Sequence, residues 1–256
     1  MLTFSLQSGS NGNAIYVEAA GARLLFDAGL SGRVAERLLA ERARDIREVD
    51  ALILSHDHAD HTRCASIWHR KFGLPIHATP GTWRAAAPAQ GRVADFRPFH
   101  AGATLDFGRV AVHTLPTPHD GADGVAFVVE AEGLRLGIFT DLGHPFPLLE
   151  RWLERVDAAY LESNYDPEML AHGPYPPALQ DRIRGAGGHL SNDEAAALLH
   201  GCRRKPRWIA LAHLSAQNNR PDVALHTHRA AAGRDYPFHL AGRDGPSDLL
   251  ELRARS

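Results

Sequence analysis

The amino-acid sequence predicts an α/β fold in which two β-sheets lie face to face between outer layers of helices. Short apolar runs punctuated by Gly, Asn and Asp fill the first half of the chain, whereas helical patterns dominate the last third. No repeat of fixed period, low-complexity segment or long linker interrupts the 256 residues. We therefore expect a single domain over residues 1–256.

The first third alternates strand and helix signals. A Gly- and Asn-rich turn at residues 8–13 separates the first two expected strands, and Ser31 is expected to cap the first helix. The apolar run at residues 51–55 predicts a buried strand that leads directly into a histidine-rich segment. The expected strands are 2–6, 14–19, 23–27 and 51–55, and the expected helices are 31–44 and 62–72.

The remaining two thirds repeat this pattern and become more helical towards the end. Glu132 and Gly133 predict the turn of a hairpin between two apolar runs. The expected strands are 76–78, 94–96, 104–107, 109–115, 125–130, 134–140, 158–162, 208–212 and 236–240. The expected helices are 147–155, 177–185, 192–203 and 222–232.

Composition narrows the class of protein. The formal net charge is −2, so the chain lacks the strongly basic balance typical of nucleic-acid binding, although a local basic face remains compatible with it. The run at residues 203–207 is one basic cluster, and a solvated helix end is the favoured interpretation of it. With two cysteines, no long apolar stretch and no basic N-terminal segment, we expect a cytoplasmic protein without disulfides, signal peptide or membrane span.

Four residues of metal-binding type follow the apolar strand within six positions, as His56, His58, Asp60 and His61. His56 and His58 can point the same way from an extended segment, because residues two apart share one face of a strand. Asp60 and His61 come after the chain turns, so they can serve a second ion nearby. Imidazole and carboxylate groups suit Zn²⁺, Mn²⁺ or Fe, and burying so many polar groups without a metal would be costly.

This His-x-His-x-Asp-His pattern resembles the signature of the metallo-β-lactamase superfamily, which implies that family's four-layer αββα fold. Asp27, in Asp-Ala-Gly, is similar to the aspartate that supports the metal-binding loop from behind. His119, Asp141 and His213 lie at the ends of apolar runs and resemble the remaining metal ligands. Taken alone, each of these three residues would more often be structural, and it is their order along the chain that carries the resemblance.

The resemblance implies a centre with two divalent metal ions. His56, His58 and His119 would bind one ion, Asp60, His61 and His213 would bind the other, and Asp141 would bridge them. Two ions about 3.5–4 Å apart can lower the pKa of a shared water and neutralise charge on an in-line phosphoryl transition state. Asp57 is expected to polarise a ligand histidine or the water.

Further segments resemble the YycJ/WalJ branch of the superfamily, whose members are described as nucleases acting on DNA. That branch is similar to ribonuclease Z and to the cyclic phosphodiesterase PhnP. The resemblance implies that His189 assists phosphodiester cleavage and that Glu162 steadies it, whereas a neighbour of a helix N-cap is the alternative reading of His189. The segments that carry this resemblance are 162–166, 173–176, 188–196 and 212–219.

Other activities on this fold are less compatible with the sequence. Flavodiiron reductases carry an acidic residue at the position of His58, lactamases usually lack an equivalent of Asp141, and β-CASP nucleases insert a large domain before the position of His213. A non-catalytic metal scaffold would need a missing ligand, and none is missing. We therefore expect a metal-dependent phosphodiester hydrolase, with a 5′-to-3′ exonuclease on DNA as first hypothesis. A small-molecule cyclic phosphodiesterase of the PhnP type is the alternative, and the oligomeric state is left open, a dimer being one option.

Overall fold

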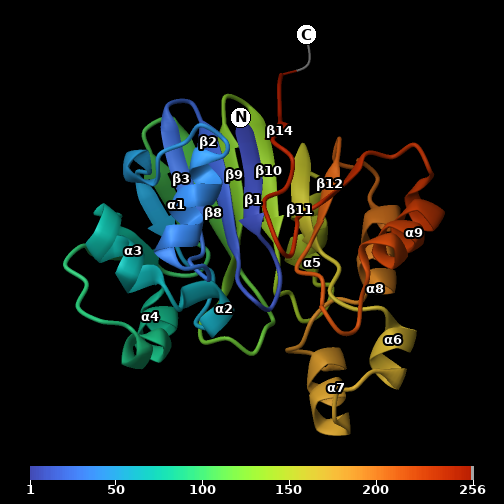
Figure 1. Ribbon diagram of the computed structural model, residues 1–256. Coiled ribbons are helices and arrows are strands. Elements are labelled where there is room, and N and C mark those ends of the chain that lie inside the picture. Colours follow the sequence, from blue (N-terminus) through green and yellow to red (C-terminus); the bar gives the residue numbers. More distant parts are fainter. Residues whose placement is uncertain (255–256) are drawn as a thin grey trace.

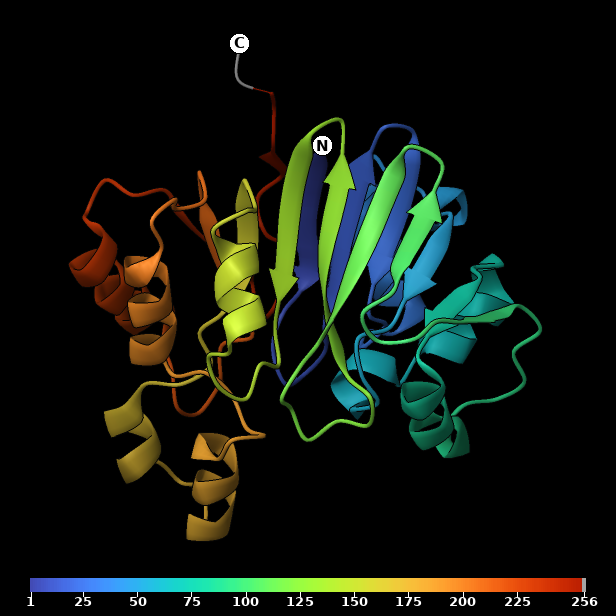
Figure 2. The same ribbon diagram turned by 180° about the vertical axis from the view of Figure 1, so that it is seen from behind.

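The computed structural model describes residues 1–254 and places their strands in two seven-stranded sheets that lie face to face (Figures 1 and 2). Figure 2 shows the green strands of the second sheet in front of the blue strands of the first. In spatial order, the first sheet consists of β14 (Leu250–Glu251), β1 (Leu2–Gln7), β2 (Ala14–Ala19), β3 (Ala22–Phe26), β4 (Ala51–Ile53), β5 (Ile76–Ala78) and β6 (Phe96–Pro98). The second consists of β13 (Phe238–Leu240), β12 (Ile209–Ala212), β11 (Ala158–Glu162), β10 (Leu134–Phe139), β9 (Val125–Ala131), β8 (Val110–Pro116) and β7 (Thr104–Phe107).

Helices cover the outer face of each sheet and complete four layers (Figure 1). On the first sheet lie α1 (Gly32–Ala40) and α3 (Ala65–Phe72). On the second lie α5 (Pro147–Leu153), α8 (Asn192–Gly201) and α9 (Pro221–Ala232). The prediction of a four-layer αββα fold is confirmed.

The alternation of side chains along the strands explains the layers. On β3, Leu24 and Phe26 belong to the core between the two sheets, whereas Leu25 belongs to the core between the first sheet and its helices. The rings of Phe26 and Phe127 meet across the sheets with centroids 4.9 Å apart. Each sheet is therefore apolar on both faces, and polar side chains collect where the strands end.

The strands that lead into the predicted site run in one direction within each sheet. Strands β3 to β6 pair in parallel in the first sheet, and β10 to β13 pair in parallel in the second. Three short helices follow the carboxyl ends of these strands along the lower edge of Figure 1, namely α2 (Ala59–Thr62), α6 (Pro167–His172) and α7 (Pro177–Arg184). Ligand sites of α/β proteins lie at such edges.

The structure differs from the sequence prediction mainly at helix ends and in short helices. The helix expected over 62–72 is broken at Cys64, whose N–H bonds to the carbonyl oxygen of Ala28 (3.0 Å) instead of continuing the helix. The helix expected over 31–44 ends at Ala40. Helices α4 (Pro80–Ala86) and α6 were not expected, because they are too short to show an apolar period, although a capping residue and a proline mark the start of each. The 3₁₀ turns η1 (Ile46–Glu48) and η2 (Ala87–Ala89) were not expected either.

Two further findings concern cysteines and membranes. Cys64 and Cys202 are buried and form no disulfide, and burial raises the pKa of the Cys202 thiol to about 11. Among residues 1–254, none of the helices has the length and apolar character needed to cross a lipid bilayer.

His77 on β5 predicts part of the pH dependence of stability. Burial lowers its pKa from 6.5 to about 4, so as the pH falls the unfolded chain binds a proton before the folded protein does. The stability contributed by neutral His77 is fully present above about pH 6.5 and is lost as the pH falls towards about 4. In the presence of a chelator, urea unfolding at about pH 7 and about pH 5 should show a smaller loss of unfolding free energy for His77→Phe than for the wild type. The control His100→Ala, at an exposed position, should behave as the wild type. Equal losses in all three proteins would contradict the prediction.

Candidate metal centre

Three strands of the two sheets end in residues that the sequence assigns to the site. Asp27 follows β3, Asp141 lies just beyond β10, and His213 follows β12. All three have left-handed backbone conformations, with φ of 65°, 57° and 56° respectively. Residues other than glycine rarely adopt this conformation, and such strained positions cluster at functional sites. Here the Asp141 and His213 side chains meet, with Oδ1 3.5 Å from Nδ1, and the Asp27 side chain reaches the same cluster through His61.

Asp27 holds the loop that carries the histidine motif. Its Oδ1 accepts the backbone N–H of Ser55 (2.8 Å), and its Oδ2 accepts the Ser55 hydroxyl (2.9 Å) and Nδ1–H of His61 (2.8 Å). Gly29 is needed two residues later, because a Cβ there would lie 1.7 Å from the carbonyl oxygen of Asp60. The Asp-Ala-Gly sequence thus shapes the loop by one carboxylate and one missing side chain.

In three of the histidines, Nδ1 makes a hydrogen-bond contact with a group outside the cluster of ligand atoms. His61 Nδ1 donates to Asp27, His119 Nδ1 donates to the carbonyl oxygen of Gly188 (2.8 Å), and His56 Nδ1 lies 2.9 Å from the Ser55 hydroxyl oxygen. These contacts fix the tautomer and leave Nε2 of each ring for the centre of the cluster. His56 Nε2 is buried and has no hydrogen-bond partner among residues 1–254.

The other two predicted ligand histidines, His58 and His213, lie in the same cluster. His58 Nδ1 lies 3.3 Å from Nε2 of His119, while its Nε2 lies 3.3 Å from Oδ1 of Asp120. His213 Nδ1 lies 3.3 Å from Glu162 Oε1, and its Nε2 lies 3.5 Å from Oδ2 of Asp60. The structure therefore brings the sequence-predicted ligand residues together. Groups whose ligand atoms lie within 4.8 Å of one another are His56–His58–His119, Asp60–His61–His213 and His56–His61–Asp141.

Charge is unevenly distributed in the cluster. Burial opposes a charge on His61, but the surrounding carboxylates, foremost Asp141, outweigh it and raise its pKa to about 9. Burial also opposes a charge on His213, whose pKa the carboxylates raise well above its usual value. Burial likewise favours a neutral Asp141, yet the neighbouring histidines hold its pKa low. At His56, burial and the other histidines together lower the pKa well below its usual range.

The donor atoms fit divalent metal ions. Imidazole nitrogen and carboxylate oxygen are ligands for Zn²⁺, Mn²⁺ and Fe. Buried Oδ2 of Asp141, like Nε2 of His56, lacks a hydrogen-bond partner in the described part of the chain, although both atoms point into the cluster. Burying such atoms without partners is costly, and bound cations would remove that cost.

Glu162 and His189 form a second layer beside the cluster. His189 Nδ1 donates to Glu162 Oε1 (2.8 Å), and Glu162 Oε2 accepts the backbone N–H groups of Leu142 (3.0 Å) and Leu190 (3.1 Å). Glu162 is fully buried, and its pKa stays well below its usual range because His189 and His213 outweigh the effect of burial. Glu162 could join a metal group with Asp141, His189 and His213, but its oxygens are already engaged in holding backbone and imidazole.

Asp57 has a contact that the sequence does not indicate. Its Oδ1 accepts the backbone N–H of Ala122 (2.6 Å), which joins the histidine loop to the segment after His119. Asp120, which follows His119, contacts the rings of His58 and His119 and was also not expected at the site. Its place next to a predicted ligand was the only signal for it in the sequence.

A cavity of about 180 Å³ opens onto the cluster. Ser10, Asn164 and Ser215 lie on its wall, and helix α7 with the turn before it contributes a further side that sequence reasoning missed. The residues from that side are Tyr175, Leu179, Arg182 and Ile183.

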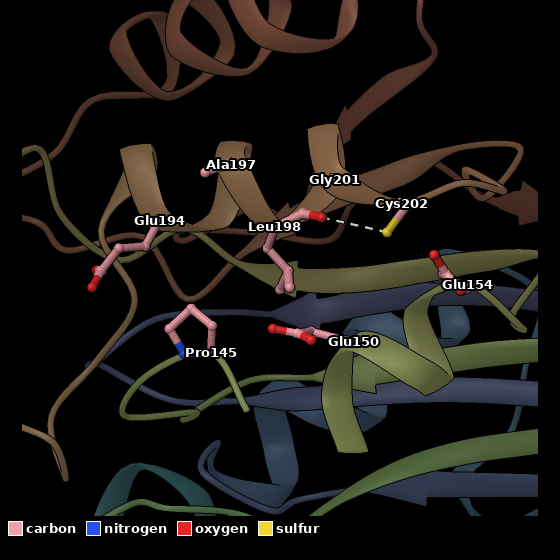
Figure 3. A pocket seen from close by; sticks show the side chains of 8 residues that line it. All are labelled: Pro145, Glu150, Glu154, Glu194, Ala197, Leu198, Gly201 and Cys202. Carbon is pink, nitrogen blue, oxygen red and sulfur yellow. Dashed lines mark hydrogen bonds between the residues drawn. The ribbon is translucent and has the colours of Figure 1, made fainter. Parts of the chain in front are cut away.

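A second cavity, of about 480 Å³, lies between α5 and α8 (Figure 3). Glu150, Glu154 and Glu194 line it, and the sequence-predicted site residues do not. The thiol of Cys202 at its edge donates to the carbonyl oxygen of Leu198 (3.4 Å). Four of the sequence-predicted ligand residues, His58, Asp60, Asp141 and His213, thus line the smaller cavity.

Residues 8–179 match the metallo-beta-lactamase superfamily. This chain belongs to that superfamily. It is 33% identical to exodeoxyribonuclease WalJ of Streptococcus pneumoniae, over 96% of this chain and 96% of that protein. It is also 33% identical to exodeoxyribonuclease YycJ of Bacillus anthracis, over 86% and 84% of the two chains. A solved diphosphatase from the PhnP family shares the fold, with a TM-score of 0.65, 17% identity and coverage of 99% of this chain and 98% of that one. The predictions of a metallo-β-lactamase-fold hydrolase and of its YycJ/WalJ-like branch are confirmed.

Asp27→Ala tests the support of the metal-binding loop. The substitution leaves the Ser55 N–H and His61 Nδ1 without their acceptor, so metal affinity should fall about 10- to 100-fold. Competition with a chromophoric chelator measures this affinity. Asp45→Ala is the matched control, since Asp45 caps the remote turn η1. Unchanged affinity in Asp27→Ala would show that the loop keeps its shape without the carboxylate.

Proposed function

We propose that this member of the metallo-β-lactamase superfamily is a binuclear metal-dependent phosphodiester hydrolase, and that it acts on DNA as a 5′-to-3′ exonuclease. The observation that carries the proposal is the Glu162–His189 pair beside the cluster of ligand residues, in which buried Glu162 holds His189 on the wall of the cavity. Relatives named as exodeoxyribonucleases, 33% identical over most of the chain, support DNA as the substrate.

The proposed ligands divide into two sets with one shared residue. His56, His58 and His119 hold one divalent ion, Asp60, His61 and His213 hold the other, and Asp141 lies between the two sets. We propose Zn²⁺ or Mn²⁺, with Fe as a further option, because histidine and aspartate accept all three. When bound, the ions would supply Lewis acidity to the phosphoryl oxygens and to the attacking water.

His189 is the proposed proton donor to the leaving oxygen. Its side chain is 13% exposed and its Nδ1–H is committed to Glu162, so Nε2 is the nitrogen available to a substrate in the cavity. Glu162 fixes the orientation of the ring through this hydrogen bond. We propose that Asp57 helps to position a ligand histidine. Its hydrogen bond from the Ala122 N–H holds the histidine loop near His119.

The cysteines and the core between the sheets support proposals about cellular location and domain organisation. Two free, buried cysteines fit a reducing compartment, so we propose a cytoplasmic location. We also propose that residues 1–256 form one domain, because the core between the sheets contains residues from both halves of the chain, such as Phe26 and Phe127.

Two substitutions separate metal binding from proton transfer. His61→Ala should lose metal and activity together, whereas His189→Ala should keep its metal and lose activity about 10²- to 10⁴-fold. Metal content by mass spectrometry and hydrolysis of a phosphodiester measure the two effects. The control His172→Ala, at an exposed position on α6, should match the wild type. If His189→Ala keeps full turnover, its proposed role is wrong.

A small-molecule cyclic phosphodiesterase is the second candidate function. A net charge of −2 favours it, since phosphate contacts dominate affinity for nucleic acids, and a PhnP-family protein shares the fold. Titration with 5′-phosphorylated duplex DNA and with a small cyclic nucleotide, at several salt concentrations, distinguishes the two. A nuclease should bind DNA with an affinity that falls steeply with salt and should degrade it. Turnover of the cyclic nucleotide alone would favour the second candidate.

A further inference from the structure

Helix α7 forms one side of the cavity and contributes apolar side chains to it, whereas the cluster of proposed metal ligands is polar. Leu179 and Ile183 lie on it, and Tyr175 lies in the turn before it. Leu170 on α6 packs with these residues in a small cluster that is separate from the three main cores. Helix α7, backed by α6, therefore forms a distinct wall of the cavity, and both helices lie near the carboxyl ends of the strands (Figure 1).

Arg182 is the only lysine or arginine that lines the cavity within residues 1–254. The carboxylates of Asp60 and Asp141 line the same cavity, so the guanidinium is the one permanent positive group that the chain itself supplies there. Its side chain is 47% exposed and is reachable from solvent.

Contacts with Asp120 orient the guanidinium and leave some of its N–H donors free to bind a ligand. Arg182 Nε donates to Oδ2 of Asp120 (2.6 Å), and Nη2 donates to Oδ1 (3.0 Å). An arginine side chain has five N–H donors in a planar fork, so three remain free of partners in the described part of the chain. A fork fixed on one edge and open on another suits a tetrahedral oxyanion, to which arginine binds in bidentate fashion.

The position of Asp120 places this fork close to the reaction centre. Oδ1 of Asp120 lies 3.3 Å from Nε2 of His58 and 3.5 Å from Nε2 of His119. One carboxylate thus separates the guanidinium from two proposed metal ligands. A phosphate bound to Arg182 would be a neighbour of the phosphate undergoing hydrolysis.

We propose that Arg182 binds a second phosphate of the substrate, adjacent to the scissile phosphodiester. The inference rests on the proposed function and deepens it, since it assigns the cavity to a nucleotide strand with consecutive phosphates instead of an isolated phosphodiester. Tyr175 and Leu179 supply an apolar surface beside this phosphate, which fits the sugar and base of the same nucleotide. Arg182 is a substrate-binding residue and takes no part in proton transfer.

A different role for Arg182 is to hold Asp120, and through it His58. The two roles predict different kinetics. Loss of phosphate binding would weaken only substrates that carry a second phosphate. Loss of support for His58 would weaken every substrate alike, because it would disturb the metal ligands.

Kinetics with three substrates separate the roles in the metal-loaded, full-length protein. The substrates are bis(4-nitrophenyl) phosphate, a thymidine dinucleotide, and the same dinucleotide with a terminal phosphate at the 5′ or the 3′ end. Arg182→Ala should raise KM about tenfold or more for a phosphorylated dinucleotide, leave its kcat within about twofold, and leave the other two substrates unchanged. Arg182→Gln should behave in the same way, because it keeps one donor towards Asp120 but no charge. The matched control Arg184→Ala, on the same helix but outside the cavity lining, should behave as the wild type. Equal losses on all substrates, or no loss on any, would overturn the proposal.

A binding measurement keeps the inference independent of turnover. The dinucleotides are prepared with a methylene group in place of the bridging ester oxygen, and their affinity is measured by calorimetry. A terminal phosphate should tighten binding to the wild type about tenfold, and Arg182→Ala should abolish that gain. If the wild type hydrolyses no phosphodiester, the proposed function fails, and this measurement alone decides the role of Arg182. A wild type that gains nothing from either terminal phosphate would contradict it.

Discussion

The carboxylate of Asp27 joins the first sheet to the loop that carries the histidines, and the geometry of the centre depends on it. Both of its oxygens are engaged, one by the backbone of Ser55 and the other by the Ser55 hydroxyl and His61. The left-handed backbone at Asp27 costs about 1–3 kcal/mol, and the same cost recurs at Asp141 and His213. The two apolar-faced sheets supply the stability that keeps these three turns in place.

Glu162 plays the corresponding part in the second sheet. Its Oε2 accepts the backbone N–H groups of Leu142, after β10, and of Leu190, before α8. Its Oε1 contacts Nδ1 of His189 and of His213. One buried carboxylate thus sets the position of a proposed metal ligand and of the proposed proton donor. Effects of substitutions at these positions will not add, because residues in one hydrogen-bond network are energetically coupled.

The sequence was sufficient for the parts of the site that depend on local spacing. His56, His58, Asp60 and His61 follow one strand within six positions, and their type and spacing predict a shared centre. Their partners could be placed only through family resemblance, because nothing local links His213 to Asp60, which lies 153 positions earlier. The roles of all these residues remain predictions, although the structure brings the side chains together.

What the sequence could not indicate were contacts between distant segments and elements too short to show a period. Arg182 contacts Asp120, which lies 62 positions earlier in the sequence, and no local pattern predicts that contact. Helix α6 has six residues, fewer than two turns, so its apolar positions cannot establish a helical repeat. The bond from Cys64 to Ala28 that breaks the helix after the histidine motif is likewise a tertiary contact, which overrides local helix propensity.

The wall formed by α7 is tied to the proposed chemistry even though its core is separate. The backbone N–H of His189 donates to the carbonyl oxygen of Ile183 (2.9 Å), at the end of the helix that carries Arg182. Gly188 allows this contact, since a Cβ there would lie 2.0 Å from the same oxygen. The helix that carries Arg182 is therefore tied by a backbone hydrogen bond to the residue that is proposed to protonate the leaving oxygen. Hydrolysis of a strand with the wrong phosphate spacing would be slow for a geometric reason, because the scissile group would lie away from His189 while the second phosphate was bound.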